Sequence, residues 1–330
     1  MLKQLLVCLA VVASGHPSYA DPLVHTFSIV ARDPATGDLG VAVQSHWFSV
    51  GSLVTWAEAG VGAVATQSFV DPSYGTRGLD LMRAGRAAPQ ALEELVALDM
   101  MRDGRQVAMI DAHGRVSAYT GKSAIAAAGH RVGREYAVQA NLMANDKVWP
   151  AMAAAFESTR GDLADRMLAA LDAGQAAGGD IRGKQSAALL IVRGKGTGRP
   201  WAGADRAFDL RVDDHADPIR ELRRLVRLQR AYTHANQGDE LMTQQKIADA
   251  LKEYAAAGRL APEIVELPFW QAVTLASIGR LAEAEPIFKA VFAKEPVWAD
   301  LVARLPAAGL LPDDAALIKR IQALAPSRRR

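Results

Sequence analysis

Four short apolar runs between His25 and Ser68 constrain the fold of this chain more than any other feature. The runs are Phe27 to Ala31, Leu39 to Ser45, Leu53 to Trp56 and Val61 to Thr66, and each has the length and composition of a β-strand. The first two are separated by Asp33-Pro34-Ala35-Thr36-Gly37-Asp38, and the last two by Glu58-Ala59-Gly60. Because Asp, Pro and Gly favour turns, we expect a β-meander of four strands.

The pattern then changes to helices and back to strands. Apolar residues from Leu79 to Leu98 recur at helical spacing, and Gly85 and Pro89 divide them into two helices. Strands are expected at Gln106 to Ile110, Arg115 to Tyr119, Tyr136 to Ala140, Ala187 to Val192 and Ala207 to Val212, with two Ala-rich helices in Val148 to Leu171. This order favours an α+β sandwich in which helices cover the faces of the sheets.

From about Ala216 onward the strand signals stop, and Leu, Ala and Arg recur with helical period. A repeat is visible there: Ala250, Tyr254, Ala256 and Pro262 are matched 34 residues later by Ala284, Phe288, Ala290 and Pro296. The period and residue types resemble the tetratricopeptide repeat, whose helix pairs commonly bind peptides or protein partners. We therefore expect a small all-α domain over residues 216–330, capped by the first domain and by a helix from Asp313 to Leu324. Packing against the first domain is the alternative role for this tail.

The N-terminus has the pattern of a secretory signal over residues 1–20, with Lys3, an apolar core from Leu5 to Ala13 and the small-residue site Ser18-Tyr19-Ala20. We therefore expect a periplasmic or secreted protein whose first domain spans residues 21–215. Cys8, the only cysteine, lies in this signal, so the mature chain has no cysteine-based metal site. No later run is apolar enough to span a membrane, and a formal charge of +2 gives no field that attracts nucleic acid. No cofactor motif is present, and a homo-oligomer is compatible with the sequence.

Thr26 opens the first strand run, and this position matters chemically. Amide hydrolysis needs a nucleophile, a base and donors for the oxyanion, and a chain-terminal threonine supplies both a hydroxyl and an amine. The segment from Thr26, followed by a hairpin and GVAVQSH, resembles the opening of N-terminal nucleophile hydrolases of the proteasome-subunit type, which fold as four-layer αββα sandwiches. DIRGKQS, running into Ala187 to Val192, resembles their supporting turn, which implies that Asp180 is the supporting carboxylate.

Residues 26 to 193 more closely resemble the bacterial domain-of-unknown-function 1028 family, itself grouped with these hydrolases. The matching strings are TFSIVARDP, GVAVQSHWFSVG, WAEAGVGAVATQS, RQVAMIDAHGRV, AGH, VQANLM and GGDIRGKQSAAL. Some members carry a C-terminal extension described by inference as peptidoglycan-binding, and the resemblance implies the same role for the tail here.

Three further polar residues complete the predicted site: Ser45 and His46 as a hydroxyl and imidazole pair that assists proton transfer, and Asn141 as an oxyanion donor. Each also has a structural interpretation. Thr26 suits a strand, Ser45 and His46 suit the end of a strand, and Asn141 suits a turn.

We expect hydrolysis of a small non-peptide or peptide amide, with Thr26 unmasked by self-cleavage after His25. This cleavage is needed because Asp21 to His25 would otherwise remain in front of Thr26. The alternative is a catalytically silent protein that binds a small ligand or cell-wall fragment while the tail recruits a partner.

Overall fold

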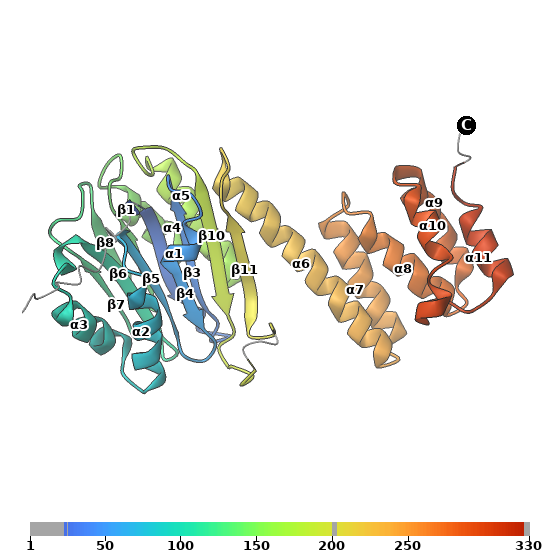
Figure 1. Ribbon diagram of the computed structural model, residues 1–330, viewed down its shortest axis with the longest axis horizontal. Helices are drawn as coiled ribbons and strands as arrows, with labels where there is room; N and C mark the ends of the chain where they lie inside the picture. The colour runs from blue at the N-terminus through green and yellow to red at the C-terminus, as the bar shows by residue number, and fades with distance from the viewer. Residues whose placement is uncertain (1–22, 25, 200–202, 327–330) are drawn as a thin grey trace, which may run out of the picture.

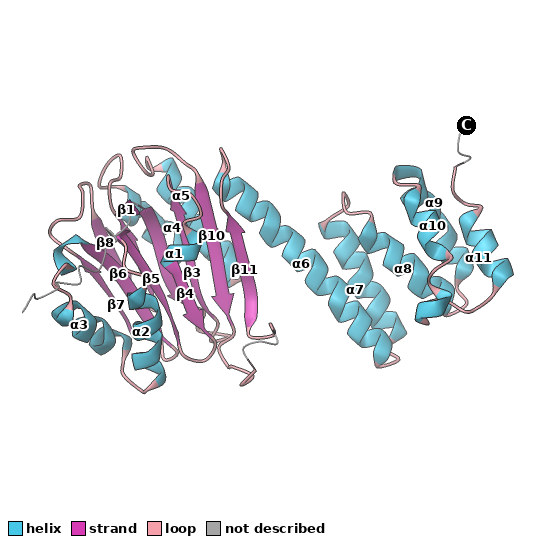
Figure 2. Ribbon diagram, viewed as in Figure 1, coloured by secondary structure: helices cyan, strands magenta, loops and turns pink. Residues whose placement is uncertain are grey.

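The computed structural model describes residues 23–24, 26–199 and 203–326 (Figure 1). The predicted signal over residues 1–20 lies outside these ranges. Within them, no helix is both long and apolar enough to cross a membrane. The described chain forms a region of two β-sheets with helices, joined by one long helix to an all-helical tail (Figures 1 and 2).

Both sheets are antiparallel. The first sheet has the order β1-β5-β6-β7, with β4 also paired to β5, and consists of β1 (Leu23–Val24), β4 (Thr55–Glu58), β5 (Gly62–Phe69), β6 (Arg105–Asp111) and β7 (Val116–Thr120). The second sheet has the order β11-β10-β3-β2-β9-β8 and consists of β2 (Thr26–Arg32), β3 (Leu39–Ser45), β8 (Gly129–Gly133), β9 (Tyr136–Ala140), β10 (Ser186–Val192) and β11 (Arg206–Val212). The predicted α+β class is confirmed.

The expectation of a single four-stranded meander is wrong, although all four runs contain strands. Strands β2 and β3 form a hairpin in the second sheet, whereas β4 and β5 form one in the first. The edge of β3 is paired along its whole length with β10, from Ser45 opposite Ser186 to Leu39 opposite Val192. That edge is therefore closed to β4, and the chain passes to the first sheet through the short helix α1 (Gly51–Val54). Strand β8 was not predicted, because GHRVG has glycines at both ends and no apolar alternation.

Helices cover the outer face of each sheet. Helices α2 (Ser73–Arg83) and α3 (Ala88–Leu98) pack on the first sheet, and α4 (Val148–Ser158) and α5 (Leu163–Ala176) pack on the second. These four helices confirm the predicted pairs. A third core lies between the sheets, where Val30, Val41 and Val43 of the second sheet meet Ala63, Ala65 and Ala108 of the first. Small alanines on one side let the two sheets approach closely.

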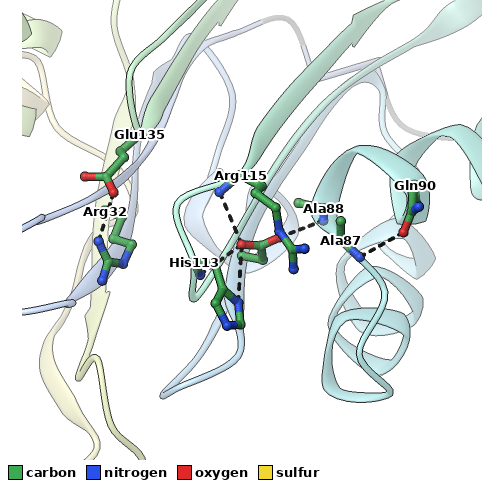
Figure 3. A network of polar contacts seen from close by, with 8 residues as sticks. Arg32, Ala87, Ala88, Gln90, His113, Arg115 and Glu135 are labelled. Atoms are coloured by element: carbon green, nitrogen blue, oxygen red, sulfur yellow. Dashed lines mark hydrogen bonds and ion pairs between the residues drawn. The ribbon is translucent and has the colours of Figure 1, made fainter.

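Asp111, at the end of β6, ties the first sheet to α3 (Figure 3). Its buried carboxylate accepts hydrogen bonds from the backbone nitrogen of Ala88 at 2.9 Å and from that of His113 at 2.9 Å. Arg115 Nε donates to the same carboxylate at 2.8 Å. The Ala88 nitrogen is one of the helix-start donors that the helix itself cannot satisfy, so Asp111 stabilises the start of α3 from outside.

Tyr136 joins β9 to α4, and its hydroxyl provides a pH-dependent stability test. The side chain is buried, lies 4.8 Å from the Phe156 ring and donates to Glu157. Burial and the Glu157 carboxylate raise the pKa of Tyr136 to about 12. Because free tyrosine ionises near pH 10, the folded state holds a proton that the unfolded state loses, and this stability disappears as pH rises from about 10 to about 12.

We expect Tyr136→Phe to cost about 1 kcal/mol of unfolding free energy at neutral pH, the value of one hydrogen bond. The cost should shrink between about pH 10 and pH 12, since the variant lacks the titrating phenol. Urea unfolding of both proteins across this range checks the result. A cost that stays constant with pH would contradict the assigned role of the hydroxyl.

A single helix, α6 (Pro218–Thr243), connects the sheet region to the tail (Figure 1). Its first turns bury Ile219, Leu222 and Val226 in the core on the outer face of the second sheet. Arginines of this helix form ion pairs with neighbouring segments, namely Arg223 with Asp172, Arg227 with Glu263, and Arg230 with Asp162 and Asp165. Arg224 pairs within the helix with Glu221.

The tail continues with α7 (Ile247–Leu260), α8 (Glu266–Ser277), α9 (Leu281–Lys294), α10 (Val297–Val302) and α11 (Ala315–Gln322). Helix α9 begins and ends 34 residues after α7, as the repeat predicts. The matched pairs Ala250 and Ala284, and Tyr254 and Phe288, are buried, and α11 closes the end of this core through Ile321. Ala290 is exposed, so the pair that it forms with Ala256 has no shared packing role.

Candidate functional site

Three hydroxyl residues stand side by side at one end of the second sheet. Thr26 of β2 lies opposite Ser45 of β3, and Ser45 lies opposite Ser186 of β10. Successive strand residues point to opposite faces, and each of the three shares its face with residues of the core between the sheets. Thr26, Ser45 and Ser186 are all fully buried. Because they share the face of the core between the sheets, their side chains face the first sheet.

Buried amides of the first sheet contact β2 near its start. Gln67 of β5 donates through Nε2 to the Thr26 carbonyl oxygen at 3.1 Å and to Gln106 Oε1 at 2.7 Å. Gln67 Oε1 accepts from Ser28 Oγ at 2.6 Å, and Ser28 Oγ accepts from Gln139 Nε2 at 2.6 Å. The two sheets are thus joined by polar side chains at the end where Thr26 lies and by apolar ones elsewhere.

Gln106 of β6 is the centre of this network. Its Nε2 donates to the Ala140 carbonyl at 2.9 Å and to Thr120 Oγ1 at 2.9 Å, which fixes the amide orientation. The Thr120 hydroxyl also lies 2.8 Å from His130 Nδ1 at the surface. Partial burial lowers the pKa of His130. A continuous chain of hydrogen bonds therefore runs from the surface to the carbonyl of Thr26.

Asn141 follows β9 and belongs to the same network. Its backbone nitrogen donates to the Thr26 carbonyl at 3.1 Å, and its Nδ2 donates to Gln106 Oε1 at 2.9 Å. A second, longer contact of 3.5 Å joins Nδ2 to the Thr26 carbonyl. The next residue, Leu142, has a left-handed backbone with φ of 55° and turns the chain sharply away from the sheet.

Asp180 lies in a loop that crosses the end of the second sheet. The loop bridges to Met143 after β9 and, through the Gln185 nitrogen, donates at 3.0 Å to the carbonyl of Ser45 at the end of β3. Since β2 lies between β9 and β3, this loop passes the start of β2, where Thr26 stands. The Asp180 carboxylate is buried, pairs with Arg182 at 2.7 Å and accepts from the His46 backbone nitrogen at 3.1 Å.

His46 follows Ser45 directly but lies beyond the end of β3, in a bend. Its exposed ring lies against Gly183, where an added Cβ would come within 3.3 Å of the imidazole. The structure therefore brings Thr26, Ser45 and Asn141 together, and it places Asp180 and His46 in the neighbouring turn.

The site is closed to solvent. Thr26 is 0% exposed, and the strand β1 that precedes it is paired with β5, with Leu23 opposite Phe69 and Val24 opposite Ser68. The chain thus runs along the first sheet before Thr26 and enters the second sheet at Thr26. In the described ranges no group of three His, Cys, Asp or Glu side chains is arranged to hold a metal ion.

Sequence reasoning missed the amides that join the two sheets. Gln67, Gln106 and Gln139 each occupy an inward-facing position of an otherwise apolar strand. A polar residue at such a position is costly unless it is paired, and this signal marks a buried network. The strings ATQS, RQVAMI and VQAN contain the signal, but it cannot be read until strand faces are assigned.

Comparison with known proteins identifies the family of this chain. Residues 26–222 match the family described as "Family of unknown function (DUF1028)". The chain belongs to this family. The match begins at Thr26 and ends inside α6, so it includes the first turns of that helix. No curated protein matches the chain.

A solved structure of the same family is similar. It is the crystal structure of protein SPO2555 from Silicibacter pomeroyi, with 30% sequence identity and a TM-score of 0.55. The alignment covers 61% of this chain and 84% of the other. The expected family membership is therefore confirmed.

Proposed function

We propose that this family member is an amide hydrolase with an N-terminal threonine nucleophile, built on a four-layer αββα sandwich of the N-terminal nucleophile hydrolase type. Thr26 becomes the first residue when the chain cleaves itself after His25. Its liberated amine then takes the proton from its own hydroxyl, whose oxygen attacks the carbonyl carbon of a small non-peptide or peptide amide. The C–N bond breaks as the leaving amine takes that proton, and water then hydrolyses the threonine ester to release the acid. The arrangement of two helix-covered sheets around a shared core supports this fold type.

One observation carries the proposal. Thr26 is the first residue of β2 and of the family match, and it stands in a buried polar centre between two otherwise apolar sheets. A strand residue with no chemical role would need none of the amides that converge on its carbonyl. Buried polar networks of this kind are costly to maintain and are typical of functional sites.

We assign roles to the residues around Thr26 from the contacts that they make. Ser45, next to Thr26 across the strands, relays protons to and from the reacting groups. Asn141 supplies an oxyanion donor through its Nδ2 group, which lies 3.5 Å from the Thr26 carbonyl. Asp180 supports the start of β2 through its turn. We give His46 no proton-transfer role, because it is exposed and lies against Gly183, whereas Thr26 and Ser45 are buried.

We also propose that the protein acts in the periplasm or outside the cell, and that the tail binds a protein or peptidoglycan partner. Support for partner binding comes from a groove of about 490 Å³ between α6 and α8, lined by Met242, Trp270 and Leu310 among others. Leu310 is 45% exposed, as an apolar contact residue for a partner would be.

The test is the N-terminus of the purified protein. Intact mass and N-terminal sequencing of the exported wild-type chain should show a start at Thr26. The isosteric variant Thr26→Val should start at Asp21, because it lacks the hydroxyl that cleaves the preceding bond. A wild-type chain that starts at Asp21 would instead favour the catalytically silent binding protein.

A further inference from the structure

Strand β1 occupies an edge of the first sheet that other strands leave open. One side of β5 is paired with β6 from Gly62 to Ser68, and the first half of its other side, Gly62 to Ala65, is paired with β4. The two residues of β1 cover the remaining part of that second side, at Ser68 and Phe69. Without β1, the end of β5 would present unpaired backbone groups, which readily accept another strand.

The direction of β1 relates this edge to the predicted cleavage point. Leu23 lies opposite Phe69 and Val24 opposite Ser68, and the chain enters the second sheet at Thr26. Leu23 and Val24, which lie shortly before the cleaved bond, therefore run antiparallel to β5. They occupy the path that the acyl side of an amide substrate would follow to reach Thr26.

We propose that, once β1 is released, the β5 edge at Ser68 and Phe69 binds the acyl side of an extended peptide substrate through backbone hydrogen bonds. This inference rests on the proposed function and narrows its substrate class to peptides with at least two residues before the cleaved bond. Recognition by strand addition gives affinity through the main chain.

Ser68 shows a second feature that points to a ligand. It is fully buried, has a left-handed backbone with φ of 74°, and its Oγ has no hydrogen-bond partner among the residues that the structure describes. Both the backbone geometry and the unpaired hydroxyl cost free energy, and such residues gather at binding sites.

The edge is also held in place independently of β1. Arg105 Nη1 donates to the Phe69 carbonyl at 2.6 Å, and Arg105 is itself buried and paired with Asp99 at 2.8 Å. The Phe69 ring packs against Gly104, where an added Cβ would approach the ring to 3.0 Å. The end of β5 is therefore preorganised to receive a strand, which lowers the entropic cost of binding.

The test uses the chain's own sequence as a probe. The fluorescent peptide amide Pro-Leu-Val-His, which copies residues 22–25, is titrated against the full exported chain and followed by anisotropy. Wild-type protein that starts at Thr26 should bind it, whereas Thr26→Val, which keeps β1, should not. Adding Leu23→Pro and Val24→Pro to Thr26→Val removes the donors of β1 and should restore binding. Peptide methylated on its Leu and Val nitrogens should bind at least about ten times more weakly, because it loses backbone donors.

The outcomes separate the two proposals. Failure of the Thr26→Val chain with both proline substitutions to bind the peptide, while its thermal unfolding stays cooperative, would overturn the edge inference without any dependence on cleavage. Equal affinity for the methylated peptide would overturn it as well. A wild-type chain that keeps Asp21, combined with peptide binding by the proline variant, would overturn the proposed function and leave the binding edge supported.

Discussion

Thr26→Val is expected to lower kcat/KM for an amide substrate by about a thousandfold or more, because it removes the nucleophilic hydroxyl and keeps the shape of the side chain. The measurement is release of p-nitroaniline from the anilide of Pro-Leu-Val-His by the wild-type and variant proteins. Thr26→Ser, which keeps the hydroxyl and loses a methyl group, should retain measurable turnover. This pair of variants distinguishes a nucleophile from a strand residue, since valine suits a strand at least as well as threonine does.

One control is needed because Thr26→Val also keeps the segment that closes the site. The variant is therefore measured again with Leu23→Pro and Val24→Pro, which weaken the pairing of β1 with β5. Turnover should still be absent, since the hydroxyl is missing. Wild-type rates in either valine variant would show that Thr26 is a structural residue of β2.

Gln106→Leu is expected to reduce the free energy of unfolding by about 3 to 5 kcal/mol. The substitution removes the acceptor of Gln67 and Asn141 and the donor to the Ala140 carbonyl, and each buried polar group left unpaired costs about 1 to 3 kcal/mol. Leucine fills most of the same volume, so the loss reports hydrogen bonding rather than a cavity. Urea unfolding monitored by tryptophan fluorescence measures the change.

The matched control is Gln237→Leu, an exposed glutamine on α6, which should change stability by no more than about 0.5 kcal/mol. A loss below about 1 kcal/mol for Gln106→Leu would mean that water or rearranged side chains replace the network. The double variant Gln67→Leu and Gln106→Leu should cost less than the sum of the two single changes, because each removes the other's partner.

The elements could be read from the sequence, but their assembly could not. Strand and helix positions follow from local periodicity, and the two helices divided near Gly161 appear as α4 and α5. Whether β3 pairs with β4 or with β10 depends on competition between strands far apart in the chain, which local pattern does not record. The prediction of a single four-stranded meander was wrong for this reason.

The candidate site likewise could be predicted only in part from the sequence. Thr26, Ser45 and Asn141 gather because three strand ends meet, and the polar residue at each end could be noticed in the sequence. The exposure of His46 next to the buried Ser45 depends on β3 ending between them, a boundary that the sequence pattern does not mark. The role of Gln106 depends on a second sheet whose register against the first has no sequence signature.

The unbroken helix α6 gives the molecule a mechanical property. Its 26 residues extend over about 39 Å, with the first turns locked into one hydrophobic core and the last turns packed on α7. If the tail binds a partner as proposed above, this continuous helix would hold the partner at a fixed distance and orientation from the end of the sandwich where Thr26 lies. Because the first turns of α6 pack on the outer face of the second sheet, a displacement of the tail would also move the helices and strands of that layer.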